Sequence, residues 1–344
     1  MALLAVAVLA AVLASVQPLR GASASPTAKM YWTDQGTYKI QRSNLDGSGV
    51  EDLVTPAGEV RPGGIAIDMS AGKMYWTDDL VDKIQRANLD GSGVEEVVTH
   101  IVAAPQRIAL DVAGGKMYWT LAGADYIQRA NLNGIGGVGY TPVPFRGTGI
   151  ALDVTGGKMY WTVRASADMI LRANLNGSGV EYLVTTGLRG ASGIALDVAA
   201  GKMYWTDLET QKIQQANLDG SGVIDLVTGV GAADIALDVT CGRMYWTNPG
   251  TDNIQRAKLD GSGVEDLVIT GLNNPIGIAL DITPPRDCVA VGGIVGLQTD
   301  ADAPVDAANS SSARGSYVQI AALAVGAIVT LGAGGWYARR RRLR

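Results

Sequence analysis

The chain of 344 residues has very little histidine, cysteine and phenylalanine, with one, two and one copies respectively. Its single histidine is His100, for which we expect a surface or capping role. No nucleophile stands beside a base in the pattern that covalent catalysis requires. We therefore expect no enzymatic activity, no catalytic metal and no cofactor.

An excess of positive charge is also missing. The chain carries 28 Lys and Arg against 33 Asp and Glu, a formal net charge of −5. The C-terminal arginines Arg339, Arg340, Arg341, Arg342 and Arg344 leave the remainder more acidic still. Proteins that bind nucleic acid neutralise backbone phosphates with Lys and Arg. We expect no nucleic-acid partner.

Repetition is what the sequence has in abundance. A Lys-Met-Tyr-Trp-Thr segment, with Arg replacing Lys in the last copy, recurs six times at intervals of 41 to 44 residues. Its tryptophans are Trp32, Trp76, Trp119, Trp161, Trp205 and Trp246. Repeats of about 40–45 residues with strand-like content are typical of β-propeller blades, which bury their sheets only by stacking.

Four strands can be placed in each repeat, as the second copy illustrates. We expect strands A to D at 65–68, 73–77, 83–89 and 94–98. The Asp90-Gly91 pair between the last two predicts a tight hairpin, because glycine adopts φ > 0 without steric penalty.

The order of strand types predicts how the ring closes. The first repeat, from Lys29, has no A strand before it, and the last A strand, Ile278–Asp281, has no B strand after it. That A strand should complete the first blade and leave no open edge. We predict an all-β, six-bladed propeller over residues 29–288 with four-stranded antiparallel blades.

Both ends of the chain indicate export and anchoring. Residues 1–24 resemble a signal peptide that ends at Ala22-Ser-Ala24. Residues 317–338 are uncharged and long enough to span a bilayer as a C-terminal transmembrane helix, with a buried core helix as the alternative. The arginines at 339–344 predict a cytoplasmic tail, and therefore an extracellular propeller on the cell membrane. Residues 289–316 predict a flexible stalk between the propeller and the membrane.

An exported chain gives its cysteines and sequons significance. Cys241 and Cys288 follow A strands of adjacent blades on the same face, so we expect a disulfide, with two buried thiols as the alternative. Asn176 and Asn309 lie in glycosylation sequons, which matter only in an organism that modifies them.

The repeat motifs carry a resemblance to a known family. Tyr-Trp-Thr-Asp at 31–34, 75–78 and 204–207 resembles the repeats of the low-density lipoprotein receptor family, as do Ile194–Asp197 and Ala216–Gly222. The resemblance implies a six-bladed extracellular propeller for protein binding or ligand release. Two departures from the family pattern matter. The final Asp of the motif is replaced in three blades, by Leu121, Val163 and Asn248, and no cysteine-rich modules flank the repeats. The endocytic and lipoprotein roles of the family are therefore not carried over to this chain.

The recurring motif residues have a structural interpretation. Six Tyr-Trp pairs around a ring predict packing between blades, and the motif Asp is expected to bond to backbone between blades. The Asn-Leu-Asp-Gly-Ser-Gly segments predict plain hairpins, since they lack the closing acid of a calcium loop.

A candidate binding surface comes from the connections that differ between repeats. The B–C and D–A connections emerge on one face, here named the variable-loop face, and variable loops on a rigid scaffold are common binding sites. Four D–A connections carry Arg61, Arg107, Arg146 and Arg189, which can receive a carboxylate, a sulfated glycan or an acidic loop. The third blade adds Tyr126, Tyr140 and Phe145 as candidate anchors.

Alternatives to this site remain open. The arginines can instead pair with Asp78, Asp79, Asp125 or Asp168, and loop variation can be neutral drift. We expect a membrane-anchored, receptor-like propeller that binds a protein or other anionic ligand. A structural cell-surface protein without a specific ligand is one alternative. The other is a propeller hydrolase or lactonase, with a metal in the channel.

Overall fold

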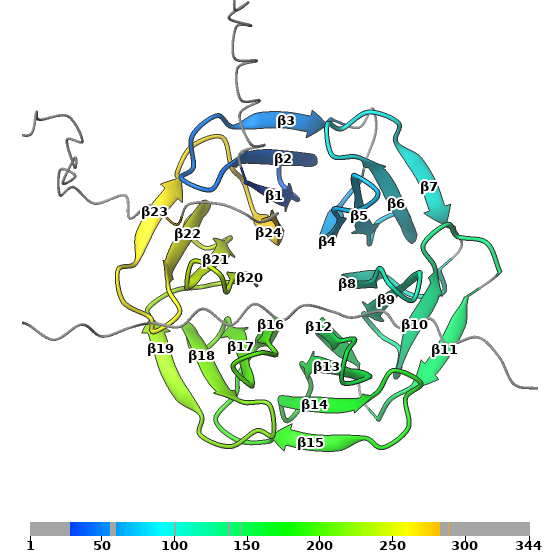
Figure 1. Cartoon of the computed structure of the whole chain (residues 1–344), viewed down its shortest axis with the longest axis vertical. Coiled ribbons are helices and arrows are strands. Elements are labelled where there is room, and N and C mark those ends of the chain that lie inside the picture. Colours follow the sequence, from blue (N-terminus) through cyan, green and yellow to red (C-terminus); the bar gives the residue numbers. More distant parts are fainter. Residues whose placement is uncertain are drawn as a thin grey trace, which may run out of the picture. The chain divides into compact units, whose positions relative to one another are not determined.

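The computed structural model describes residues 28–55, 60–99, 101–136, 138–144, 146–282 and 288. These residues belong to the first of two units, Met1–Val289. Their strands form six four-stranded antiparallel sheets, which are the blades of a propeller arranged around one axis (Figure 1). The predicted all-β, six-bladed propeller of four-stranded antiparallel blades is confirmed.

The blades are numbered here by the order of their B strands. Blade 1 holds β24 (Pro275–Asp281), β1 (Lys29–Asp34), β2 (Lys39–Asn44) and β3 (Glu51–Val54). Blade 2 holds β4 (Pro62–Asp68), β5 (Lys73–Asp78), β6 (Lys83–Asn88) and β7 (Glu95–Val98). Blade 3 holds β8 (Pro105–Asp111), β9 (Lys116–Leu121), β10 (Tyr126–Asn131) and β11 (Gly139–Pro142).

The remaining three blades repeat this plan. Blade 4 holds β12 (Gly147–Asp153), β13 (Lys158–Val163), β14 (Met169–Asn174) and β15 (Glu181–Val184). Blade 5 holds β16 (Ala191–Asp197), β17 (Lys202–Asp207), β18 (Lys212–Asn217) and β19 (Ile224–Thr228). Blade 6 holds β20 (Asp234–Asp238), β21 (Arg243–Asn248), β22 (Asn253–Lys258) and β23 (Glu265–Val268).

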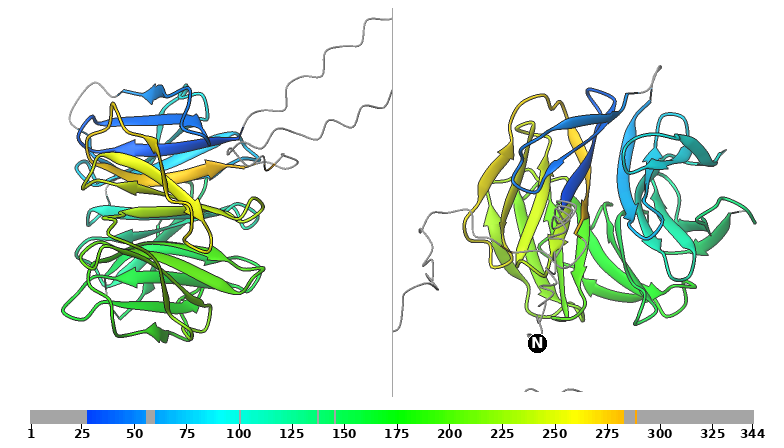
Figure 2. Two further views of the ribbon diagram at one scale, coloured as in Figure 1. Left: turned by 90° about the vertical axis from the view of Figure 1, so that its left-hand side faces the viewer. Right: turned by 45° about the horizontal axis from the view of Figure 1, so that its top comes forward.

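The ring closes through strands from the two ends of the repeat region. β1 pairs antiparallel with β24 from Lys29 opposite Asp281 to Trp32 opposite Ile278. The two strands lie side by side at the meeting of blue and orange ribbon in Figure 2. The predicted closure is confirmed, and β24 begins three residues earlier than expected, at Pro275.

Packing between blades follows from the alternation of side chains along strand B. Successive residues of a strand point to opposite faces, so Met and Trp face one neighbouring blade while Tyr faces the other. Tyr31 of blade 1, for example, packs in one cluster with Met74 and Trp76 of blade 2. The same Tyr-to-Trp contact joins all six successive pairs, including Tyr245 of blade 6 with Trp32 of blade 1.

The motif threonine forms a second, polar link between blades. Its hydroxyl donates to a carbonyl of the next blade's A strand in every blade, over distances from 2.5 to 3.4 Å. In five blades it also accepts an amide of its own A strand, where a bulge interrupts the register. All six threonines, at 33, 77, 120, 162, 206 and 247, have no solvent exposure. This ring of hydrogen bonds was not predicted from the sequence.

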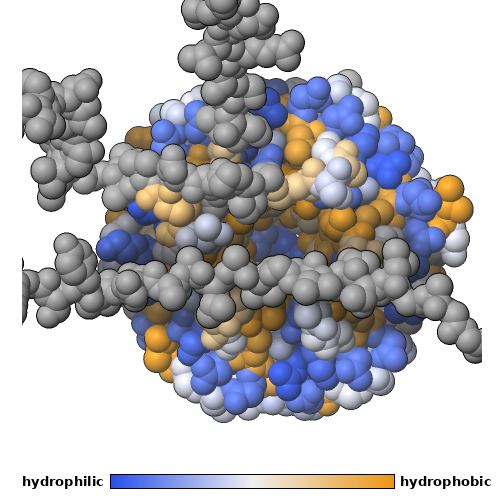
Figure 3. Space-filling model, viewed as in Figure 1, coloured by the Kyte–Doolittle hydropathy of each residue, from blue (hydrophilic) through white to orange (hydrophobic). Residues whose placement is uncertain are grey.

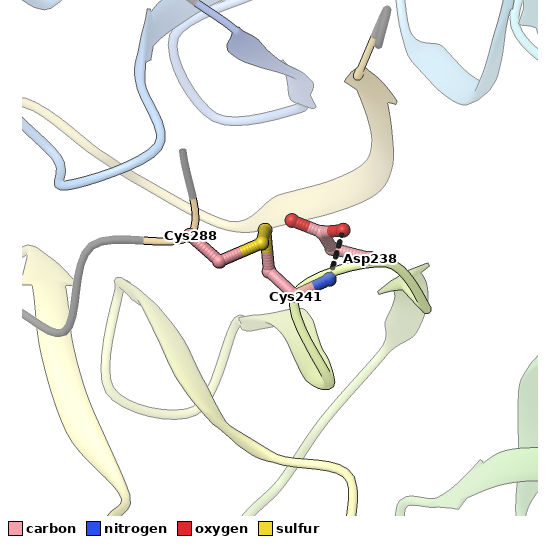
Figure 4. The surroundings of a disulfide bond; sticks show 3 residues. All are labelled: Asp238, Cys241 and Cys288. Carbon is pink, nitrogen blue, oxygen red and sulfur yellow. Dashed lines mark hydrogen bonds between the residues drawn. A yellow bond between two sulfur atoms is a disulfide. The ribbon is translucent and has the colours of Figure 1, made fainter. Parts of the chain in front are cut away.

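The disulfide predicted between Cys241 and Cys288 is present, with its Cα atoms 5.2 Å apart. Figure 4 shows it beside the turn in which Asp238 accepts the amide of Cys241. A link of this kind, closing a loop of tens of residues, stabilises a fold by about 2–4 kcal/mol. It ties the residues that follow β24 to the turn between β20 and β21.

Several expectations concern residues outside those described. They include the signal peptide at 1–24, the stalk at 289–316, the transmembrane helix at 317–338, the tail at 339–344, and His100, Phe145 and Asn309. Among the described residues, none forms a helix long and apolar enough to cross a membrane.

One blade lacks an internal hydrogen bond that the other five possess. The indole Nε1–H of the motif tryptophan donates to a strand C glutamine in five blades, at 2.8 to 3.1 Å. In blade 4 that position holds Leu171, and the buried Trp161 Nε1 has no partner. A buried donor without an acceptor costs about 1–3 kcal/mol.

We predict that Leu171→Gln stabilises the protein by about 1 kcal/mol, because it supplies the missing acceptor. The site suits glutamine, because blade 3 has a glutamine in the same setting. Gln128 of blade 3 pairs with Tyr140 of strand D, just as Leu171 of blade 4 pairs with Tyr182. The free energy of unfolding in urea provides the measurement. Leu171→Met is the control, being similar in size without an acceptor, and a glutamine variant less stable than this control contradicts the prediction.

Candidate functional site

One position in the six A strands lies where neighbouring blades approach each other closely. Four blades have glycine there and two do not: the residues are Gly64, Arg107, Gly149, Gly193, Asp234 and Gly277. A Cβ on Gly64 would lie 2.7 Å from Arg107 Cα, and one on Gly277 would lie 2.5 Å from a carbonyl oxygen of blade 2. Neighbouring A strands therefore approach too closely for most side chains at this position.

The two exceptions meet across the channel. Arg107 lies on β8 and Asp234 on β20, three blades apart and on opposite sides of the ring in Figure 1. Arg107 Nε lies 3.2 Å from Asp234 Oδ2, and the two side chains are only 10% and 12% exposed. The ion pair therefore occupies the interior of the channel.

Backbone groups complete the surroundings of this pair. Arg107 Nη2 donates to the carbonyl of Ala233 at 3.3 Å, and Asp234 accepts the amides of Ile235 and Ile278. Burial raises the pKa of Asp234, and the charge of Arg107 opposes that rise. Arg107 Nε itself has no aligned hydrogen bond, so the contact at 3.2 Å is an ion pair without one.

The four arginines predicted on the D–A connections therefore do not form one exposed group. Arg107 is buried and pairs with Asp234, which is none of the acids considered from the sequence. Arg61 pairs with Asp79 at 2.5 Å, and burial raises the pKa of Asp79 against the effect of Arg61. Arg146 and Arg189 are exposed.

The other candidate residues are distributed differently. Tyr126 at the start of β10 is half-buried against the core shared by blades 2 and 3. Tyr140 lies in β11, but its side chain, like all of Phe145, falls outside the described part. Asn176 is exposed at the hairpin between β14 and β15. Asp168 accepts the amides of Gly190 and Ala191, so it supports the backbone of the next blade.

A cavity of about 330 Å³ lies at the mouth of the channel on the variable-loop face. All six blades contribute to its wall, and its polar side chains include Gln35, Asp79, Gln106, Arg107, Arg164 and Asn274. Arg164 pairs with Glu209 of the next blade at 2.9 Å. Gln106 and Arg164 were not among the predicted site residues, although both lie where the A strands and B–C connections vary.

The recurring acids have the structural roles that were expected. Asp34 Oδ2 accepts the amide of Asn273 at 2.7 Å, in the connection that enters blade 1. Asp46 accepts both the amide and the hydroxyl of Ser48, which lowers its pKa and confirms the hairpin interpretation. Among the described residues, no three His, Cys, Asp or Glu side chains are grouped as metal ligands.

We predict that Arg107→Met alone destabilises the protein by about 3–5 kcal/mol, because it leaves the Asp234 carboxylate buried without its partner. Adding Asp234→Asn should recover much of that loss. Urea unfolding of both single variants and the double variant gives the coupling energy. A double variant whose loss equals the sum of the single losses contradicts a cross-channel pair.

Comparison with known proteins agrees with this architecture. The model of the low-density lipoprotein receptor repeat class B matches residues 72–112, 201–238 and 242–282. No curated protein matches the sequence.

Three solved structures have a similar fold. A crystal structure of a nidogen/laminin complex matches at 20% identity and a TM-score of 0.67, covering 74% of this chain and 98% of that chain. TolB from Acinetobacter baumannii matches at 14% identity and a TM-score of 0.60, covering 74% of this chain and 66% of that chain. A putative TolB from Agrobacterium tumefaciens matches at 12% identity and a TM-score of 0.55, covering 75% of this chain and 99% of that chain.

These identities show the fold alone, whereas the matched repeats connect that fold to particular motifs. Each matched segment runs from strand B of one blade to strand A of the next, as in Lys73–Asp111 of blades 2 and 3. The chain is a six-bladed β-propeller, and three of its repeat segments match the low-density lipoprotein receptor class B repeat.

Proposed function

We propose that this chain is a protein-binding propeller that recognises its partner through the variable-loop face. The observation that carries the proposal is the cavity at the channel mouth, to which all six blades contribute side chains that differ between repeats. The similar nidogen propeller belongs to a complex with laminin, and that likeness supports protein recognition.

The chemistry of this face favours a partner with acidic groups. Arg146 and Arg189 are exposed, whereas Arg61 and Arg164 are already paired with Asp79 and Glu209. Exposed guanidinium groups form bidentate hydrogen bonds with carboxylates, which gives both affinity and orientation. Arg107 contributes from within the channel by fixing the floor of the cavity.

The same ion pair weighs against the hydrolase alternative. A propeller hydrolase would place a metal among convergent carboxylates or histidines near the axis. Here the Arg107 guanidinium lies near the axis with its positive charge, and Asp234 is committed to it. A cation at that point would meet like charge.

We also propose that the propeller is displayed outside the cell on a C-terminal membrane span at 317–338. The support is the uncharged length of that segment and the arginines that follow it. The full chain should remain with membranes after a high-salt wash, and a chain ending at residue 316 should not. A full-length chain that a salt wash releases contradicts the anchor.

The binding face is tested with a partner captured on the full chain and identified by mass spectrometry. We predict that Arg146→Gln with Arg189→Gln raises the Kd at least tenfold, because the carboxylates of the partner lose their hydrogen-bond donors. Folding should change by no more than about 0.5 kcal/mol, since both side chains are exposed.

Hairpin substitutions on the opposite face are the matched control. Ser92→Ala and Ser221→Ala should leave the Kd unchanged. If these hairpin changes abolish binding while the arginine changes have no effect, the partner binds the other face. If the full chain captures no specific partner, the alternative of a structural surface protein gains support.

A further inference from the structure

Strand C carries an arginine in the same place in five blades. These residues are Arg42, Arg86, Arg129, Arg172 and Arg256, and blade 5 has Gln215 instead. Each guanidinium donates to the carbonyl of a hairpin leucine in the following blade, at 2.8 to 3.4 Å. The bond made by Arg129, to Leu175, is the longest of the five.

Four of these arginines also pair with a glutamate of their own strand D. The pairs are Arg42 with Glu51 at 2.8 Å, Arg86 with Glu95 at 2.7 Å, Arg172 with Glu181, and Arg256 with Glu265 at 2.6 Å. In blade 3 the strand register puts Gly139 opposite Arg129. The acid that this position has elsewhere is therefore missing.

A second acid is missing from the same place. In three of the blades the arginine lies near a hairpin aspartate of the following blade. Hydrogen bonds from serine lower the pKa of that aspartate most, and the charge of the arginine lowers it further. These pairs are Arg42 with Asp90, Arg172 with Asp219, and Arg256 with Asp46. The hairpin that follows Arg129 has the neutral Asn176 instead. Arg86 also faces a neutral hairpin residue, Asn133, but it keeps Glu95.

The hairpin of blade 3 departs from the pattern at one more position. Ser48, Ser92, Ser178, Ser221 and Ser262 occupy this place in the other blades, where the serine amide bonds to the preceding Asp or Asn. Blade 3 has Ile135, which is 71% exposed, more than any other large hydrophobic residue in the described ranges. In Figure 3, hydrophilic residues cover much of the outer rim of the propeller, which is the setting of these hairpins.

The outer edge of blade 3 is also unprotected by charge. The first two residues of strand D include at least one acid in blades 1, 2, 4, 5 and 6, but β11 begins Gly139-Tyr140. Charged side chains on an edge strand discourage the addition of another strand. Their absence removes this barrier at Gly139 and Tyr140, the first two residues of β11, where an extended segment can pair.

We propose that Arg129, Ile135 and Gly139, here named the blade 3 rim, bind an extended acidic segment of a partner protein. A carboxylate of that segment takes the place of the missing glutamate on Arg129, and an apolar side chain packs on Ile135. The other blades show that a carboxylate fits this guanidinium at 2.6 to 2.8 Å. The blade 3 rim involves none of the residues of the variable-loop face and does not depend on the function proposed for it.

A synthetic peptide of alternating Glu and Leu, with a Gln–Leu peptide of the same length, tests this proposal on the full chain by isothermal titration calorimetry. In the Arg146→Gln/Arg189→Gln background, which removes the carboxylate donors of the variable-loop face, the Glu peptide should bind with one site per chain, and the Gln peptide at least tenfold more weakly. Arg129→Gln should weaken the Glu peptide at least tenfold. Gly139→Glu should do the same, because it restores the internal acid.

The Gly139→Glu variant is expected to fold. A Cβ at Gly139 would lie 3.3 Å from Nε of the flexible Arg129 side chain and in ordinary contact with the Arg129 carbonyl, at 3.8 Å. The backbone of Gly139 does not have positive φ. If this variant still proves unstable, Arg129→Gln decides the matter alone. Equal affinity for both peptides, no binding of either, or binding unchanged in the variants overturns the proposal.

Blade 2 offers a gain-of-function control. It already has Arg86 followed by the neutral Asn133, so Glu95→Gly with Ser92→Ile reproduces the blade 3 rim there. The number of Glu peptide sites should rise from one to two per chain. A site number that remains at one shows that the three residues are not sufficient and contradicts the proposal.

Discussion

The hydroxyl of the motif threonine links each blade to the next, and the rest of the propeller is arranged around that link. It joins the amide of its own A strand to a carbonyl of the neighbouring blade, at a position without solvent exposure. Because a buried amide or carbonyl without a partner is costly, the A strands are held at one separation around the ring. The Tyr-to-Trp contacts fill the space further out at that same spacing.

The close approach of the A strands determines what the channel can contain. Glycine stands at this position in four blades, where a Cβ would lie within 3.0 Å of the neighbouring A strand. The two side chains that do occur there, Arg107 and Asp234, form an ion pair across the ring. Taking charges out of water is expensive, so the pair is better understood as closing the channel than as adding net stability.

The differences between blades are concentrated where no packing constraint acts. Strand B is almost invariant because both its faces are buried, while the B–C and D–A connections and the outer rim of blade 3 vary. Around Arg129, Gly139 and Ile135 of blade 3 and Asn176 of blade 4 replace the acids and serine of other repeats, while the hydrogen bond from Arg129 to Leu175 is kept at 3.4 Å. Recognition can therefore vary while the ring stays the same.

The sequence by itself determined the number of blades, their strand order and their closure, because each of these follows from the period and from one missing A strand. It also predicted the Cys241–Cys288 link and the backbone role of Asp34, since both are local or join neighbouring blades. The pair of Arg107 with Asp234 was decided only by the tertiary structure. Their positions were visible as two exceptions among glycines, but residues 127 apart in the chain face each other only once six blades have closed around an axis.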